Sequence, residues 1–157
     1  MNRRICVLGL LAISLAGCAS MQPQNVVQVI GSDPDLSTLS KLISDAGLNE
    51  TLAGAGPFTV FAPTNEAFKA VPAKTMAELA ANKDELKRVL TYHVLPAKSA
   101  AAEVKVGNMK TVNGANVALA RTANFVTVEE ALVTGADKAA TNGVVHVIDR
   151  VLLPPKQ

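Results

Sequence analysis

Two side chains of this sequence, His93 and His146, have the chemistry to transfer protons or to bind a metal near neutral pH. His93 follows Leu86 and Val89 at spacings that place it on the apolar face of a predicted helix. His146 stands between Val145 and Val147 in an apolar run that is typical of a buried strand. No third ligand stands near either histidine in the sequence. We therefore favour imidazoles that hydrogen-bond to nearby backbone over catalytic or metal-binding ones, and we predict no metal and no cofactor.

Other signatures of catalysis are missing from the sequence. It contains no G-x-S-x-G elbow and no S-x-x-K pair, and its two cysteines, Cys6 and Cys18, both lie near the N-terminus. The string LAGAGPF at residues 52–58 lacks the lysine and the spacing of a phosphate-binding loop. We therefore predict that the protein is not an enzyme.

The N-terminus has the pattern of a secretory signal peptide, which we assign to residues 1–17. Arg3 and Arg4 precede an apolar run that is too short to span a membrane comfortably, and small residues follow it. The string LAGC, which ends at Cys18, resembles the bacterial lipobox, in which the cysteine thiol is lipidated and the peptide is cut just before it. The alternative is an ordinary signal peptide with an incidental cysteine.

Lipidation at Cys18 predicts a protein that is held on a membrane without crossing it. Residues 18–25 then form a lipidated linker, and Ala19 resembles the sorting signal for the outer membrane of a Gram-negative cell. We expect the protein in the bacterial cell envelope, on the periplasmic or the surface face. The formal charge of +2 disappears with Arg3 and Arg4. This neutrality and the scarcity of aromatic residues argue against a nucleic-acid partner.

Apolar spacing changes along the chain from helical to strand-like. Residues 26–94 carry mostly helical periods and residues 104–154 mostly strand patterns, which indicates an α+β fold. Gly47 and Leu48 predict a Schellman ending of a helix. The segment 75–78 reads as a capping box, and Asn82 reads as the cap of the next helix. Asn113-Gly114 predicts a hairpin, with a loop that Ala115 and Asn116 can lengthen.

Three strings of the sequence resemble landmarks of the fasciclin (FAS1) domain. They are GPFTVFAPTNEAF at residues 56–68, LTYHVLP at 90–96 and NGVVHVIDRVLLP at 142–154. The resemblance implies a FAS1 domain over residues 26–157, with N-terminal helices packed on a wedge of two short-stranded β-sheets. Glu129-Glu130 departs from the family pattern, because many relatives carry a glycine-containing turn there, and this leaves the register of that hairpin open.

The family resemblance also marks Tyr92 and His93 as a binding pair, because Tyr-His dipeptides in animal FAS1 domains are implicated in adhesion. The helical phase favours a structural role for both residues, because it makes them at least half buried. Our first hypothesis is a non-catalytic lipoprotein that mediates cell adhesion or binds a protein or a carbohydrate. The alternative is a periplasmic binder of a small apolar ligand, in a pocket lined by four phenylalanines: Phe58, Phe61, Phe68 and Phe125.

Overall fold

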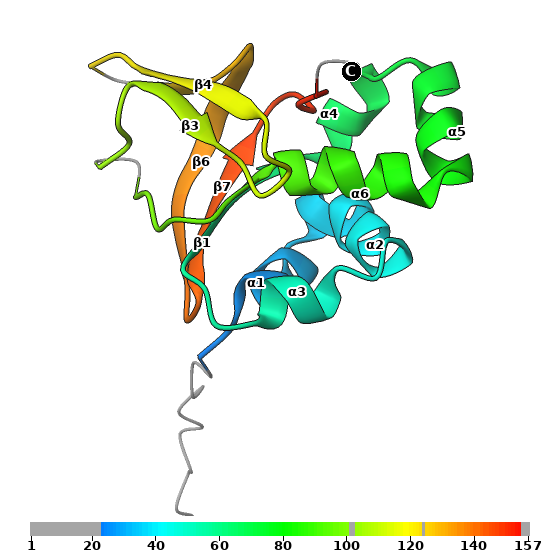
Figure 1. Ribbon diagram of the computed structural model, residues 1–157, viewed down its shortest axis with the longest axis horizontal. Helices are drawn as coiled ribbons and strands as arrows, with labels where there is room; N and C mark the ends of the chain where they lie inside the picture. The colour runs from blue at the N-terminus through cyan, green and yellow to red at the C-terminus, as the bar shows by residue number, and fades with distance from the viewer. Residues whose placement is uncertain (1–22, 101–102, 124, 155–157) are drawn as a thin grey trace, which may run out of the picture.

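The computed structural model describes residues 23–100, 103–123 and 125–154 of the chain (Figure 1). The predicted signal peptide and the predicted lipidation site, Cys18, lie outside these residues. Among the helices of the described part, none is long and apolar enough to cross a bilayer.

The first half of the chain is mainly helical. Its elements are α1 (Val26–Ser32), the 3₁₀ turn η1 (Pro34–Leu36), α2 (Ser37–Asp45), α3 (Asn49–Ala53), α4 (Asn65–Ala70), α5 (Ala73–Ala81) and α6 (Lys83–Tyr92). Helix α2 ends in the predicted Schellman motif, because Gly47 has a φ of 69° and the Leu48 N–H donates to the Ile43 carbonyl at 3.0 Å.

The caps of α5 and α6 differ from each other. Asn82 caps α6 as predicted, since its side chain accepts hydrogen bonds from the N–H groups of Asp84 and Glu85. The predicted capping box at 75–78 is wrong. Helix α5 already begins at Ala73 after Pro72, and the Pro72 carbonyl accepts from the Met76 N–H at 3.1 Å. The fixed φ of Pro72 starts the helix early, so Thr75 lies within the first turn.

Seven strands form a wedge against these helices. They are β1 (Phe58–Pro63), β2 (Val94–Leu95), β3 (Gly107–Lys110), β4 (Asn116–Arg121), β5 (Val126–Val128), β6 (Ala131–Ala140) and β7 (Gly143–Ile148). Their order is β2-β1-β7-β6-β5-β4-β3. The long strand β6 belongs to both halves of the wedge, because it pairs with β5 at one end and with β7, across two register shifts, at the other. The predicted α+β architecture is confirmed.

The sheet also closes back on itself beyond its last strand. The Val112 N–H donates to the Val94 carbonyl at 2.8 Å, and the Asn113 N–H donates to the Thr91 carbonyl at 3.3 Å. The predicted hairpin around Gly114 is present, with a loop between Lys110 and Asn116. The hydrogen bonds from Val112 and Asn113 cover the edge of β2, which would otherwise expose unpaired backbone groups.

The turn at Glu129-Glu130 gives the register that the sequence left open. Val128 pairs with Ala131, so only two residues connect β5 to β6. Glu129 has a φ of 54°, in the left-handed region that glycine adopts most readily. The Glu129 side chain accepts a hydrogen bond from the Ala118 N–H at 2.8 Å, which ties this turn to β4.

Strands β1 and β7 form a parallel pair at the centre of the wedge, from Phe58 opposite Gly143 to Pro63 opposite Ile148. This pairing joins the first and last sequence landmarks. The two backbones approach so closely that a Cβ atom on Gly143 would lie 2.0 Å from the Phe58 carbonyl oxygen. Only glycine therefore fits at Gly143.

Asn142 connects the start of this pair to the helices. Its side-chain oxygen accepts from the Val26 N–H at 2.9 Å, and its amide nitrogen donates to the carbonyls of Leu52 and Gly54. The carbonyl of Gln24 accepts from the Thr141 N–H at 2.8 Å. The turn at Thr141-Asn142 thus binds the N-terminus of α1 and the C-terminus of α3.

The core consists of two apolar clusters on opposite faces of the central strands. The helices bury one cluster against β1 and β7, and its members include Ile30, Leu39 and Val145. The other cluster fills the wedge between the strands, and it includes Phe61 and Leu119. Inward residues of β1 and β7 therefore alternate between the two clusters, as the period of a strand requires.

Candidate functional site

Tyr92 ends α6 and lies inside the protein, with 3% of its surface exposed. Its hydroxyl oxygen is 3.1 Å from the Asn116 carbonyl, to which it donates, and 3.3 Å from a carboxylate oxygen of Glu129. Burial and then the negative charge of Glu129 raise the pKa of Tyr92 to about 12. Tyr92 is therefore a neutral donor that ties α6 to β4.

His93 is buried as well, with 2% of its surface exposed. Its Nδ1 lies 2.7 Å from the Val89 carbonyl and must donate to it, which leaves Nε2 to accept from the Leu152 N–H at 3.0 Å. Burial lowers the pKa of His93 from 6.5 to about 4, against the smaller opposite effect of the Val89 hydrogen bond. The neutral ring thus joins α6 to the C-terminal segment.

The binding role that the family resemblance implies for Tyr92 and His93 stays a prediction. Both side chains are used within the fold, as the helical phase indicated, and they offer a partner almost no surface. A partner that recognised this dipeptide would have to contact what surrounds it.

His146 has the opposite hydrogen-bond arrangement in β7. Its Nδ1 accepts from the Asp137 N–H at 3.2 Å, so Nε2 donates to the Ser99 carbonyl at 2.8 Å. The ring also stacks on Phe61, with centroids 5.8 Å apart. Serine, histidine and aspartate are the residue types of a hydrolase triad, but here the ring contacts backbone atoms of the other two. Both histidines thus form hydrogen bonds with backbone groups, as their positions in the sequence indicated.

The phenylalanines do not gather around one pocket. Phe61 and Phe68 are buried in the two separate core clusters, and Phe125 is 56% exposed between β4 and β5. The prediction of a phenylalanine-lined pocket between helices and sheet is therefore wrong, because side chains fill that space. Among the described residues, no group of three or more histidine, cysteine, aspartate or glutamate side chains could hold a metal ion.

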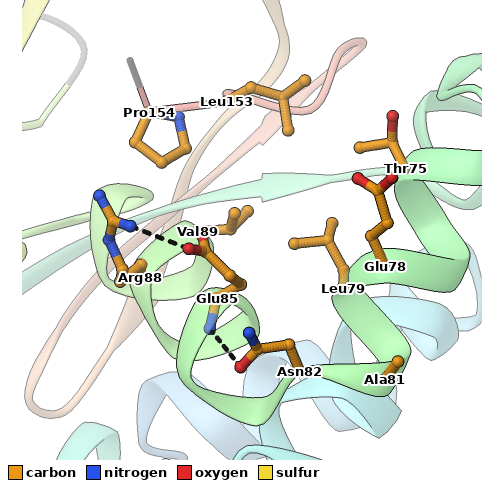
Figure 2. A pocket seen from close by; sticks show the side chains of 10 residues that line it. All are labelled: Thr75, Glu78, Leu79, Ala81, Asn82, Glu85, Arg88, Val89, Leu153 and Pro154. Atoms are coloured by element: carbon orange, nitrogen blue, oxygen red, sulfur yellow. Dashed lines mark hydrogen bonds and ion pairs between the residues drawn. The ribbon is translucent and has the colours of Figure 1, made fainter. Parts of the chain in front are cut away.

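An open hollow lies between α5, α6 and the C-terminal segment, and we call it the α5–α6 groove (Figure 2). Its volume is about 580 Å³. Leu79 of α5, Val89 of α6 and Leu153 of the C-terminal segment converge on it from three sides. The remaining lining residues are Thr75, Glu78, Ala81, Asn82, Glu85, Arg88 and Pro154.

Charged side chains stand at the rim of the α5–α6 groove. Arg88 donates to Glu85 at 2.9 Å, and the two form an ion pair along α6. Glu78 stands on the opposite wall, and within the described part of the chain it has no ion-pair partner. The groove therefore combines an apolar floor with one negative charge more than it has positive charges.

A second hollow of about 460 Å³ lies on the other side of the C-terminal segment. It is lined by Tyr92, Glu129, Glu130 and Arg150, among others, and it shares Leu153 with the α5–α6 groove. Arg150 lies 3.8 Å from Glu130, and both side chains are largely exposed. Leu153 therefore forms a ridge between two hollows, and it is 49% exposed.

Sequence reasoning did not find the α5–α6 groove. Leu79 and Val89 read as ordinary core residues of their helices, and Glu78 was assigned to the capping box. The sequence contains no spacing that brings these residues together.

The class of the protein follows from the parallel central pair, the helical cover and the two-sided wedge. This arrangement is similar to a solved pair of FAS1 domains from the insect cell adhesion molecule fasciclin I, with a TM-score of 0.66 and 19% sequence identity. The match covers 83% of this chain and 51% of that one. At this identity the likeness concerns the fold.

The chain belongs to the Fasciclin domain family, whose model matches residues 34–154. It is 44% identical over 139 residues to Protein sll1483 of Synechocystis, a match that covers 87% of this chain and 77% of that protein. It is also 37% identical over 145 residues to the cell surface glycolipoprotein MPB83 of Mycobacterium bovis, covering 88% of this chain and 64% of that protein. The predicted family is confirmed.

Proposed function

We propose that this protein is a non-catalytic adhesion module that a lipid on Cys18 anchors in the bacterial cell envelope, where it binds a protein or glycan partner. The observation that carries the proposal is the contrast between buried and exposed chemistry. Both imidazoles bind backbone groups in the interior, whereas the α5–α6 groove offers an apolar floor to the outside. Such a surface suits binding better than proton transfer.

Two relatives support the location and the role. MPB83 is named a cell surface glycolipoprotein, and fasciclin I is named a cell adhesion molecule. The LAGC string of this chain adds an independent argument for a lipid at Cys18. Ala19 favours sorting to the outer membrane.

The position of the first described residues supports a groove that faces away from the membrane. Gln24 is the sixth residue after Cys18, which allows a reach of roughly 20 Å. Gln24 itself is held at the β6–β7 turn. In Figure 1 this end of the molecule lies opposite α5 and the C-terminal segment. A lipid at Cys18 would therefore leave the groove open to partners.

Cell attachment tests the proposal. Cells that carry the intact protein, its Cys18→Ala form or a deletion are compared for attachment to matrix proteins, glycans and sister cells. We expect the deletion to reduce attachment, and the Cys18→Ala protein to leave the membrane fraction and fail to restore it. Equal attachment by the deletion strain contradicts an adhesion role, and unchanged membrane association of Cys18→Ala contradicts the anchor.

A small apolar ligand is the second candidate, because about 580 Å³ lies within the usual size of ligand pockets. Its site would be the α5–α6 groove. Native mass spectrometry of the protein purified from its own envelope separates the two functions. A bound small molecule of constant mass favours this candidate, and an empty protein contradicts it.

A further inference from the structure

The α5–α6 groove has the chemistry of a peptide-binding site. Its floor is aliphatic and includes the half-exposed Leu153, which costs free energy to keep in water unless a partner covers it. The groove lies between a helix pair and a segment without regular structure, Val151–Pro154. Within the described residues, the backbone N–H and carbonyl of Leu153 have no hydrogen-bond partner. An extended chain laid beside them could supply both.

The charges of the rim indicate what such a peptide must carry. Arg88 is already paired with Glu85, whereas Glu78 faces the groove without a partner among the described residues. A positive side chain beside Glu78 would form an ion pair with its carboxylate, and a negative side chain would be repelled by it. An aliphatic side chain next to it would reach the floor between Leu79 and Leu153.

We propose that the α5–α6 groove binds an extended segment of a partner protein in which an aliphatic residue stands beside a lysine or arginine. The aliphatic side chain packs on Leu79 and Leu153, and the cation pairs with Glu78. This inference rests on the proposed adhesion function and names the site and the partner chemistry for it.

The test uses synthetic peptides as defined probes. The full-length protein in detergent is titrated with fluorescein-labelled Gly-Ser-Leu-Pro-Leu-Lys-Gly-Ser-Gly, with a form that has glutamate in place of lysine, and with a form that has serine in place of both leucines. We expect saturable binding of the lysine peptide, binding about fivefold weaker for the glutamate form from the lost charge pair, and no binding of the serine form.

Variants of the protein locate the contact. Glu78→Gln should weaken binding of the lysine peptide about fivefold, and it should remove the difference in affinity between the lysine and glutamate forms. Glu50→Gln is the matched control, because Glu50 is an exposed helical glutamate on α3, outside the groove. It should change nothing. A photoreactive leucine in the peptide should crosslink to α5, α6 or the C-terminal segment.

Three results would overturn the inference: equal affinity for the lysine and glutamate peptides, crosslinks elsewhere, or no saturable binding up to about 1 mM. Cell attachment distinguishes this failure from that of the proposed function. If the deletion strain loses attachment while the peptides fail, the adhesion role stands and the peptide site falls. If the deletion strain attaches normally, the adhesion role itself falls.

Discussion

The two ends of helix α6 have opposite characters. At its C-terminal end Tyr92 and His93, the residues with the strongest family signal, are buried and hydrogen-bonded. In its first two turns Glu85 and Arg88 form the wall of an open groove. The comparison teaches that a recognisable dipeptide can hold a surface in place without being part of it. Tyr92 and His93 position the end of α6 and the C-terminal segment, and those elements shape the groove.

The largest effect on stability should come from a substitution at Gly143, where the backbones of β1 and β7 approach each other closely. Gly143→Ala would bring a Cβ atom 2.0 Å from the Phe58 carbonyl oxygen, so β1 and β7 would have to separate. We expect a loss of more than about 4 kcal/mol in the free energy of unfolding, or no folded protein. Urea unfolding followed by circular dichroism measures it.

Gly31→Ala is the matched control for this prediction. A Cβ atom on Gly31 would meet only the Ser40 hydroxyl, at 3.7 Å, and alanine favours the helix α1. Its stability should change by less than about 1 kcal/mol. Equal behaviour of the two variants would show that the close approach of β1 and β7 does not determine stability.

Acid should weaken the buried region through His93. The unfolded chain takes up a proton near pH 6.5, whereas the folded ring does so only near its pKa of about 4. Stability is therefore complete above pH 6.5 and falls as the pH drops toward 4, by about 3 kcal/mol in total. Protonated Nε2 would also face the Leu152 N–H with a second donor. Unfolding midpoints between pH 4 and 8 measure the slope.

The His93→Gln variant provides the reference for the pH series. Glutamine can donate and accept but does not titrate, so each protein is compared with its own stability at pH 8. The variant should lose less stability on acidification than the unaltered protein. Identical slopes would mean that His93 does not control the acid sensitivity.

Tyr92→Phe separates the structural role of the family dipeptide from a binding role. It removes the hydrogen bond to the Asn116 carbonyl but keeps the ring in the wedge cluster, so we expect a loss of about 1.5 kcal/mol. Cell attachment should persist at temperatures where the variant is folded. Lost attachment by a stably folded variant would mean that the hydroxyl itself contacts the partner.

Leu153→Ser should have the smallest effect on stability and a large one on binding. Leu153 is half exposed, so replacing it should lower the free energy of unfolding by less than about 1 kcal/mol. Binding of the lysine peptide and cell attachment should both be lost. The neighbouring Leu152→Ser is the control, because Leu152 is buried and its replacement should cost about 3 kcal/mol or more. Normal peptide binding by Leu153→Ser would show that Leu153 does not contact the peptide.

Local sequence patterns predicted the elements that depend on neighbouring residues. The Schellman ending at Gly47, the cap at Asn82 and the buried face of α6 all follow from spacing within a single helix. The family resemblance identified the two strings whose strands, β1 and β7, pair at the centre of the wedge. The capping box at Thr75 failed because Pro72 acts three residues earlier and starts the helix first.

The groove could not be predicted because it depends on three segments whose relative positions are set by packing. Leu79 and Leu153 are separated by about half of the chain, and the hydrogen bond from the Leu152 N–H to His93 brings Leu153 into place. The prediction of a phenylalanine-lined pocket was wrong for the same reason. Counting aromatic residues gives no information about which side of a strand each one occupies.

The turn at Thr141-Asn142 has a mechanical consequence for a tethered adhesion module. Tension that enters the domain at Gln24 passes at once into β6–β7 through the Thr141 N–H, and into α1 and α3 through the Asn142 side chain. The load is thus divided among several elements before it can peel α1 from the sheet. A pull on the anchor would meet the resistance of the whole domain, whose rate of forced unfolding depends on the barrier rather than on equilibrium stability.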